Sequence, residues 1–212
     1  MVQTVMPRTG TRTIEAKEPM KGGNLNADAY YIAQCVAGNR QAFATLYRRH
    51  VAKVRSTLYQ LCGAEVLDDL VQEVFLRAWK GLKNFRQTAQ FSTWLYRITW
   101  NVACDRRREL ARGRSRQLHT DPEHLQTLAD AAVAKAGSSS PLSQMHYQDV
   151  VMRGLAQLNF ERRSVLVLHD LENLPQKDVA IVLGIPVGTV KSRLFHARQA
   201  LRQYLEAEGI EL

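Results

Sequence analysis

The stretch LPQKDVAIVLGIPVGTVKSRLFHARQAL, residues 174–201, predicts two short helices joined by a tight turn. Pro175 stands where a helix can begin at no cost, because the first helical N–H has no partner within the helix. Gly184 suits the turn, and Pro186 can start the second helix in the same way. Ala180 is small, which lets the two helices cross closely. These features together predict a helix-turn-helix.

The second of these helices has one apolar face and one polar, basic face. At about 100° per residue, the apolar face carries Val190, Leu194, Ala197, Leu201 and Leu205. The opposite face carries Gly188, Ser192, Phe195, His196 and Gln199, with Lys191, Arg198 and Arg202 on one flank and Thr189 and Arg193 on the other. Polar residues would then face base edges in the major groove while the cations meet phosphates. The alternative is a solvated basic helix within a bundle.

The composition indicates a globular protein with a polyanionic partner. The chain has 212 residues, 45% of them hydrophobic, a net charge of +9 and a pI near 9.7. Such a charge favours nucleic acid or an acidic membrane surface. We find no apolar run near the roughly 18 residues of a membrane span and no signal peptide, so we expect a soluble cytoplasmic protein without membrane insertion. Cys35, Cys62 and Cys104 lack metal-ligand spacing and are expected to be buried free thiols.

Helical periodicity covers most of the chain, and strand-like alternation does not occur. We therefore predict an all-α fold with two helical domains joined by a flexible linker. Residues 1–25 form a flexible extension, 26–110 the first domain, 111–141 the linker, which ends in GSSSP, and 142–207 the second domain.

The helix predicted from about Val66 to Leu82 has an unusual outward face. Its core stripe consists of Leu67, Val71, Val74, Phe75, Ala78 and Leu82. The outward face carries Asp69, Gln72, Glu73 and Lys80 around Leu76. An apolar residue ringed by acids and an amide, in a basic protein, is typical of a docking surface for another protein. A single exposed leucine is also common on ordinary surfaces.

The helix predicted to start at Ser92 carries aromatic side chains among arginines. Its core stripe is Leu95, Ile98 and Val102, with Trp94 at the edge. Outward lie Tyr96, Trp100 and Arg107, flanked by Thr93, Arg97 and Cys104, and the preceding loop adds Lys83, Asn84, Phe85 and Arg86. Exposed rings on which bases stack, beside cations for phosphates, fit single-stranded nucleic acid. Alternatively, Trp100 packs under the linker or against the second helix, and Asp105 is expected to pair with an arginine.

Three blocks of this sequence resemble one family of bacterial proteins. DDLVQEVFLRAWKGLKNF (68–85), FSTWLYRITWNVACDRRRE (91–109) and VGTVKSRLFHARQALR (187–202) occur in the order and spacing of extracytoplasmic-function (ECF) sigma factors. The resemblance spans about residues 26–205. It implies a sigma-2 domain, a four-helix bundle, and a sigma-4 domain with the helix-turn-helix, joined by a linker that threads toward the RNA path of the polymerase.

The resemblance also implies a role for each surface in transcription initiation. It assigns docking on the RNA polymerase core, at its clamp helices, to Asp69, Gln72, Glu73, Leu76 and Lys80. It assigns melting and reading of the −10 promoter element to Lys83, Asn84, Phe85, Arg86, Thr93, Tyr96, Arg97, Trp100, Asn101, Arg107 and Arg108. It assigns reading of the −35 duplex to Gly188, Thr189, Lys191, Ser192, Arg193, Phe195, His196, Arg198, Gln199 and Arg202.

The family further implies contact with the polymerase flap, an inhibitory anti-sigma factor and service in a stress response. We expect a monomer when free, with no catalysis, cofactor or metal.

Two other functional classes compete with this interpretation. A conventional helix-turn-helix regulator, acting without being a polymerase subunit, would leave the block at 68–85 and the aromatic face unexplained. It would bind a palindrome as a symmetric dimer. An enzyme acting on nucleic acid, such as a recombinase, could use Asp68, Asp69 and Glu73 as metal ligands. No histidine or third carboxylate joins Asp69 and Glu73 on their helix face in a recognisable motif.

Overall fold

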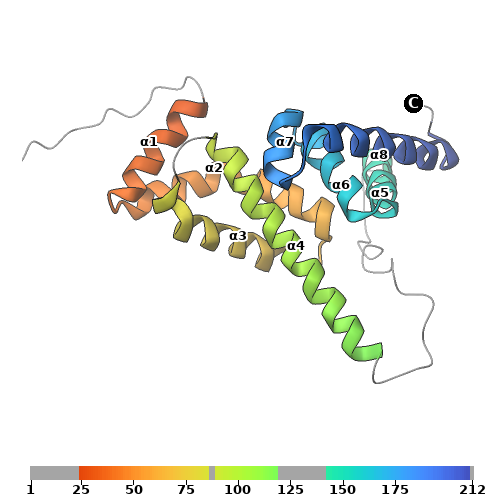
Figure 1. The fold of residues 1–212 in the computed structure, drawn as a ribbon, viewed down its shortest axis with the longest axis horizontal. Coiled ribbons are helices and arrows are strands. Elements are labelled where there is room, and N and C mark those ends of the chain that lie inside the picture. The colour runs from red at the N-terminus through yellow and green to blue at the C-terminus, as the bar shows by residue number, and fades with distance from the viewer. Residues whose placement is uncertain (1–23, 86–88, 119–141, 211–212) are drawn as a thin grey trace, which may run out of the picture.

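The chain folds into two sets of helices that pack against each other (Figure 1). The computed structural model describes residues 24–85, 89–118 and 142–210, and all regular secondary structure within them is helical. The N-terminal set comprises α1 (Asn24–Val36), α2 (Arg40–Cys62), α3 (Leu67–Gly81), the 3₁₀ turn η1 (Leu82–Asn84) and α4 (Phe91–Leu118). The C-terminal set comprises α5 (Leu142–Gln157), α6 (Phe160–Leu166), the π turn η3 (Val167–Leu171), α7 (Gln176–Leu183) and α8 (Val187–Ala207).

The helices α1 to α4 form a bundle around one apolar core. The side chain of Asn39 caps α2 by accepting hydrogen bonds from the backbone N–H of Gln41 (3.0 Å) and Ala42 (3.4 Å). Gly63 ends α2 with φ 80°, a conformation that favours glycine. The residues predicted as the core stripe of α3 are all buried, as are Leu95 and Val102 of α4. The four-helix bundle predicted for the first domain is therefore present.

The C-terminal set contains the predicted helix-turn-helix. Pro175 and Pro186 stand immediately before α7 and α8, and Gly184 makes the turn with φ 67°. The two helices are bent by 103° at the turn, within the range of the motif. Val190, Leu194, Ala197 and Leu205 are buried, which confirms the apolar face of α8, and Leu201 is half-buried. The all-α prediction holds throughout the described residues.

Some boundaries differ from the sequence prediction. α4 begins at Phe91 rather than Ser92, because the N–H of Trp94 already bonds to the carbonyl of Gln90 (3.1 Å). α4 also continues to Leu118, into the segment interpreted as linker, and it projects beyond the bundle (Figure 1). Residues 24 and 25 belong to α1. The rest of the N-terminal extension, Arg86 and 119–141 lie outside the described residues.

No single helix in the described part of the chain is long and apolar enough to cross a membrane. Together, α7 and α8 meet that criterion only as a sharply bent pair.

Candidate nucleic-acid interface

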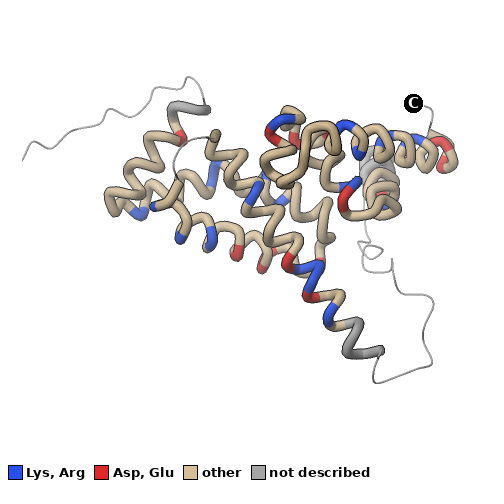
Figure 2. Tube along the Cα trace, in the orientation of Figure 1, with Lys and Arg blue, Asp and Glu red and all other residues tan. Residues whose placement is uncertain are grey.

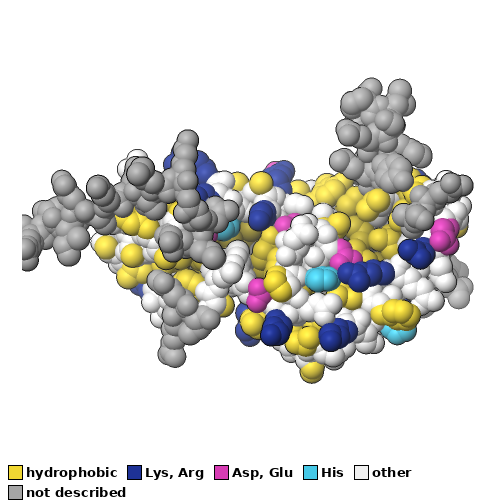
Figure 3. Space-filling view, turned by 90° about the horizontal axis from the view of Figure 1, so that it is seen from above, with side chains coloured by type: hydrophobic (Ala, Val, Ile, Leu, Met, Phe, Trp, Pro, Cys, Tyr) yellow, Lys and Arg dark blue, Asp and Glu magenta, His cyan; other side chains and the backbone are white. Residues whose placement is uncertain are grey.

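The outer face of α8 is open to solvent along its length. Gly188, Lys191, Ser192, His196, Gln199 and Arg202 are exposed, and Phe195 is 66% exposed. Thr189 and Arg193 on the flank are half-buried. Lys and Arg side chains lie among hydrophobic ones over the half of the molecule that holds α7 and α8 (Figure 3). The surface therefore has the mixture of cations and apolar contacts expected of a helix that enters the major groove.

Two arginines of α8 are held by acids from preceding segments. Arg198 donates two hydrogen bonds to the carboxylate of Asp170, from Nε at 2.9 Å and from a terminal nitrogen at 2.6 Å. Asp170 raises the pKa of Arg198 through these bonds. Arg193 donates to Glu161 at the start of α6 (3.0 Å). Both ion pairs are partly exposed, so a phosphate can compete with the carboxylate for either arginine.

The outward face of α3 matches its prediction. Leu76 is 52% exposed between the exposed side chains of Asp69, Gln72 and Lys80. Glu73 is half-buried, because it accepts a hydrogen bond from Arg77 (2.7 Å). Trp79 is a further exposed apolar residue of α3. Charged residues run along α3 and into the projecting part of α4 (Figure 2).

Asp105 links α3 to α4, as expected of a structural residue. It accepts hydrogen bonds from Arg77 of α3 (2.7 Å) and from Arg108 one turn along α4 (2.8 Å). The hydrogen bond that Arg77 donates to Asp105 is the largest cause of the raised pKa of Arg77. This network fixes the outward face of α3 relative to the base of the projecting part of α4.

The prediction that Tyr96 and Trp100 face solvent is wrong. Tyr96 is 5% exposed, within a cluster formed by η3, α6, α7 and α8, and Thr93 is buried as well. The ring of Trp100 stacks on Phe160 of α6, with centroids 4.9 Å apart and planes at 16°. Both side chains pack against the second domain. A helical wheel of α4 shows only its own periodicity and so cannot predict contacts with another domain. Arg97, Asn101, Arg107 and Arg108 are exposed, and Cys104 is half-buried.

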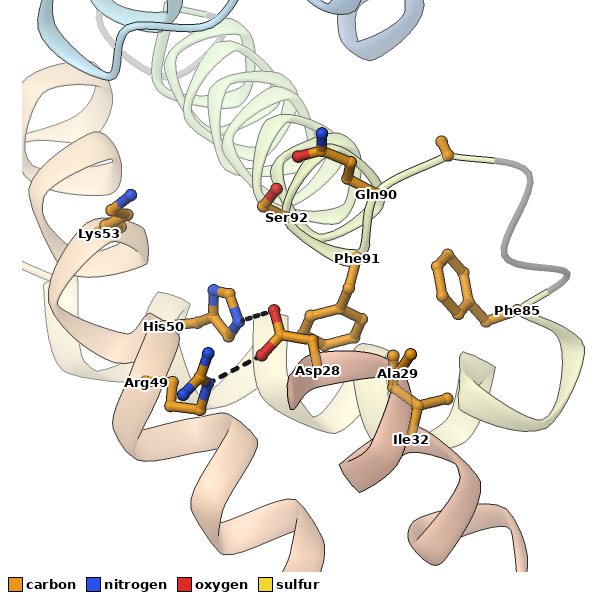
Figure 4. Close-up of a pocket in the computed structure, with 11 residues that line it drawn as sticks. Asp28, Ala29, Ile32, Arg49, His50, Lys53, Phe85, Gln90, Phe91 and Ser92 are labelled. Atoms are coloured by element: carbon orange, nitrogen blue, oxygen red, sulfur yellow. Dashed lines mark hydrogen bonds and ion pairs between the residues drawn. The ribbon is translucent and has the colours of Figure 1, made fainter. Parts of the chain in front are cut away.

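A pocket of about 570 Å³ opens beside the start of α4 (Figure 4). It is lined by the rings of Phe85 and Phe91, by Gln90 and Ser92, and by Asp28, Arg49, His50 and Lys53 from α1 and α2. Phe85 also contacts the ring of Trp94, with centroids 5.0 Å apart, so it is half-buried rather than free. Lys83 and Asn84 nearby in sequence are exposed. The volume lies within the range of small-ligand sites.

Asp28 organises the polar side of this pocket. Its carboxylate accepts hydrogen bonds from Nε of Arg49 and lies 2.8 Å from Nε2 of His50, as Figure 4 shows. Burial acts to raise the pKa of Asp28, but the bonds and charges of His50 and Arg49 outweigh it and lower that pKa. The site therefore combines aromatic walls with the guanidinium of Arg49, which Asp28 holds in place.

A second hollow, of about 720 Å³, lies between α6, η3 and α8. Leu166, Leu171, Leu201 and Leu205 give it an apolar floor, and Lys191, Arg198 and Arg202 stand at its edge with Asp170. Leu171 is itself exposed. An apolar groove with cationic edges suits an amphipathic helix that carries acidic residues.

The cysteines and carboxylates do not form a metal site within the part of the chain that the structure describes. Asp68 pairs with Arg55 and Glu73 with Arg77, so two of the carboxylates considered as metal ligands are engaged in ion pairs. All three thiols are free. Cys35 is buried as predicted, whereas Cys62 and Cys104 are half-buried, and burial raises the pKa of Cys62 to about 11.

Known families match both halves of the chain. Residues 46–113 match sigma-70 region 2, and residues 148–201 match sigma-70 region 4. The RNA polymerase sigma-H factor of Pseudomonas aeruginosa is 31% identical over 188 residues, covering 84% of this chain and 94% of that protein. The ECF RNA polymerase sigma-E factor of Escherichia coli is 31% identical over 178 residues, covering 82% and 92%.

This chain belongs to the ECF sigma factors. Two solved structures share its fold. CnrH, in complex with the cytosolic domain of CnrY, is 26% identical with a TM-score of 0.61, covering 85% of this chain and 97% of that one. The sigma factor RpoE of Bartonella quintana, in complex with the anti-sigma factor NepR, shares the fold at 22% identity and a TM-score of 0.59, covering 77% and 96%.

As an ECF sigma factor, the protein is a promoter-specificity subunit that directs RNA polymerase to initiate transcription, and it is not an enzyme. The alternative of a helix-turn-helix regulator independent of the polymerase is not favoured, since region 2 accounts for the N-terminal domain. The recombinase alternative fails for the same reason.

Sequence reasoning missed several residues of this ECF sigma factor that the fold brings to its surfaces. Asp28, Arg49, His50 and Lys53 line the pocket, and the three-residue spacing of His50 and Lys53 on one face of α2 was the available signal. Phe160 was also missed, and nothing in its local sequence indicates that it packs on α4.

Proposed function

We propose that this ECF sigma factor reads its promoter with two separate surfaces and docks on the polymerase with a third. The outer face of α8 reads the −35 element as duplex DNA. The residues from Lys83 to Arg108 read the melted −10 element. The exposed face of α3 around Leu76 binds the clamp helices of the core. The exposed face of α8 is the observation that carries the proposal most directly, because most of its polar residues are open to solvent while its apolar stripe is packed in the core.

The pocket beside α4 is our candidate site for one flipped base of the non-template strand. A base is a flat, polar ring, and the pocket offers the half-buried ring of Phe85 for stacking and Gln90 and Ser92 for its edges. Arg49 and Lys53 are placed to meet the adjoining phosphates. Flipping a base costs a few kcal/mol, which stacking and hydrogen bonds in such a pocket offset.

The apolar groove between α6 and α8 is our candidate contact for a helical segment of a protein. The polymerase flap would occupy it during initiation. An anti-sigma factor would cover the groove, and the face of α3, when the protein is inhibited. The complexes of CnrH with CnrY and of RpoE with NepR support an inhibitor of this kind.

Since a sigma factor acts where the chromosome is transcribed, we place the protein in the cytoplasm. We also propose that it is a monomer when free.

Substitution at Leu76 tests the docking surface. Leu76→Glu should weaken binding to purified core polymerase at least about tenfold, because it places a charge in the centre of an apolar contact. Leu110→Glu is the matched control, since Leu110 is another exposed leucine, on α4 and outside the proposed surface. Binding is measured by fluorescence anisotropy of the labelled protein. Equal affinity of the Leu76 variant and the wild type would remove α3 from the docking surface.

A further inference from the structure

One carboxylate stands among the cations on the flank of α8 that we assign to phosphates. Asp170 lines the hollow between α6, η3 and α8 together with Lys191, Arg198 and Arg202. These three cations follow one side of the helix, since their spacing corresponds to whole helical turns. Asp170 therefore lies where the DNA backbone passes if α8 enters the major groove.

Asp170 holds one of these cations with both of its oxygens. Nε of Arg198 donates to one carboxylate oxygen at 2.9 Å, and a terminal nitrogen donates to the other at 2.6 Å. An arginine binds a phosphate in the same paired geometry, so Asp170 occupies the donors that a phosphate would use. The contact of Arg193 with Glu161, through one terminal nitrogen at 3.0 Å, is less constrained.

The π turn η3 fixes Asp170 beside α8. Val167 and Leu168 are buried at the start of the turn, and the N–H of Glu172 bonds to the carbonyl of Val167 (3.0 Å). Asp170 falls within this turn, and its side chain is 27% exposed. Turns of this kind frequently occur at functional positions. The carboxylate is thus a fixed feature of the domain.

The other two cations of the flank remain available to DNA. Lys191 and Arg202 are exposed, and neither forms an ion pair with a residue whose side chain the structure describes. The affinity of a protein for DNA of any sequence depends on the number of cations that neutralise phosphates and release counterions. Asp170 lowers that number by one as long as it holds Arg198.

Binding to unrelated DNA and binding to the −35 element should use Arg198 differently. On unrelated DNA, α8 makes backbone contacts alone, and no base contact holds a phosphate beside Arg198. On the matching sequence, base contacts seat the helix and bring the backbone to its flank in a fixed position. The guanidinium can then exchange the carboxylate for a phosphate with the same paired geometry.

We propose that Asp170 is a specificity-determining residue: it withholds Arg198 from unrelated DNA and releases it to the backbone only when base contacts seat α8 on the −35 element. This inference rests on the proposed role of α8. Without the carboxylate, affinity for unrelated DNA rises more than affinity for the −35 element, so discrimination between them falls.

Asp170→Asn tests the proposal, because it removes the charge and keeps the shape of the side chain. Asp149→Asn is the matched control, since Asp149 also pairs with an arginine of the same domain, Arg153 of α5 (3.6 Å). Circular dichroism and thermal melting establish that each variant is folded. Fluorescence anisotropy with the full-length protein, between about 50 and 200 mM salt, then measures binding to two labelled duplexes. One carries the −35 block found by run-off transcription, and the other has the same bases in scrambled order.

Asp170→Asn should bind the scrambled duplex about threefold to tenfold more tightly than the wild type and the control do. The slope of log K against log salt should be steeper by about 0.9, the value for one added phosphate contact. A purely structural role of Asp170 would not move this slope. Binding of the −35 duplex should change less than about twofold. Unchanged affinity and slope on the scrambled duplex, or equal tightening on both duplexes, would overturn the proposal.

Arg198→Gln tests the exchange independently of any variant at Asp170. It should weaken binding of the −35 duplex at least about threefold and binding of the scrambled duplex less than about twofold. In this background, Asp170→Asn should change affinity for the scrambled duplex less than about twofold, because the residue it acts through is gone. A full gain in the double variant would mean that Asp170 acts by general repulsion, and would contradict the exchange.

Lys191→Ala separates this inference from the proposed function. Unchanged binding of both duplexes by Lys191→Ala and by Arg202→Ala would mean that α8 does not hold DNA, which contradicts the proposed function. Weaker binding by Lys191→Ala, together with no effect of Asp170→Asn, overturns the inference about Asp170 alone.

Discussion

At the scale of single residues, Asp28 holds one side of the candidate base pocket. Asp28→Asn should lower the free energy of unfolding by about 1–3 kcal/mol at neutral pH, because Arg49 and His50 lose the charge that they face. A carboxyl whose pKa is lowered by folding stabilises the protein above its ordinary pKa of 3.8. That contribution is lost as the pH falls through the folded-state pKa.

Urea unfolding of the wild type and of the Asp28→Asn variant at several pH values measures this contribution of Asp28 to the free energy of unfolding. The difference between the two proteins should shrink as the pH falls below about 4. Asp69→Asn, at an exposed position of α3, is the control and should change stability by less than about 0.5 kcal/mol. A constant difference down to low pH would mean that Asp28 acts through packing and not through its charge.

The proposed contact of Arg193 with the −35 duplex can be tested directly by substitution. Arg193→Ala should weaken binding of the −35 duplex by the polymerase holoenzyme by about 1–3 kcal/mol if Arg193 contacts a base. Glu161→Gln should do the reverse, because it releases Arg193 from its ion pair and removes a negative charge near the DNA. Arg153→Ala, on α5, is the matched control. Unchanged promoter binding after Arg193→Ala would remove this residue from the reading set.

At the scale of elements, α5 and α8 pack so closely that a methyl group does not fit between them. A Cβ on Gly154 would lie 2.7 Å from Leu201 and 2.8 Å from Tyr204 of α8. Gly154→Ala should destabilise the protein, since overpacking costs about 1–3 kcal/mol and helix propensity returns at most about 1 kcal/mol.

Gly113→Ala, in α4, is the matched substitution. A Cβ at Gly113 meets nothing within 4 Å. This variant should therefore gain about 0.5–1 kcal/mol from helix propensity alone. Thermal unfolding compares the two, and a stabilised Gly154 variant would show that α5 shifts to make room.

The elements that the sequence predicted best are those with strong local signals. The buried stripe of α3 and the two prolines and glycine around α7 and α8 required no knowledge of distant residues. The exposure of Tyr96 and Trp100 was predicted wrongly because both depend on contacts far along the chain, which no periodicity in α4 records. Trp100 stacks on Phe160, 60 positions later, and Tyr96 bonds to Glu172, 76 positions later. The pocket was missed for the same reason: Asp28 and His50 reach it from α1 and α2.

At the scale of the whole molecule, the protein presents three surfaces whose availability differs. The face of α3 and the outer face of α8 are open, and the aromatic face of α4 is covered by α6, η3 and α7. A conventional helix-turn-helix regulator would need only the open face of α8 to bind its DNA, whereas an ECF sigma factor also uses its N-terminal domain.

Run-off transcription with purified core polymerase on genomic fragments tests the central claim most directly. Wild-type protein should direct initiation at discrete sites, and aligned start sites should share two sequence blocks at −35 and −10. Arg193→Ala should reduce transcription most from templates whose −35 block matches the shared sequence best. Trp100→Ala should block open-complex formation. Failure to direct initiation with core, together with tight binding of the free protein to duplex promoter DNA, would contradict the account.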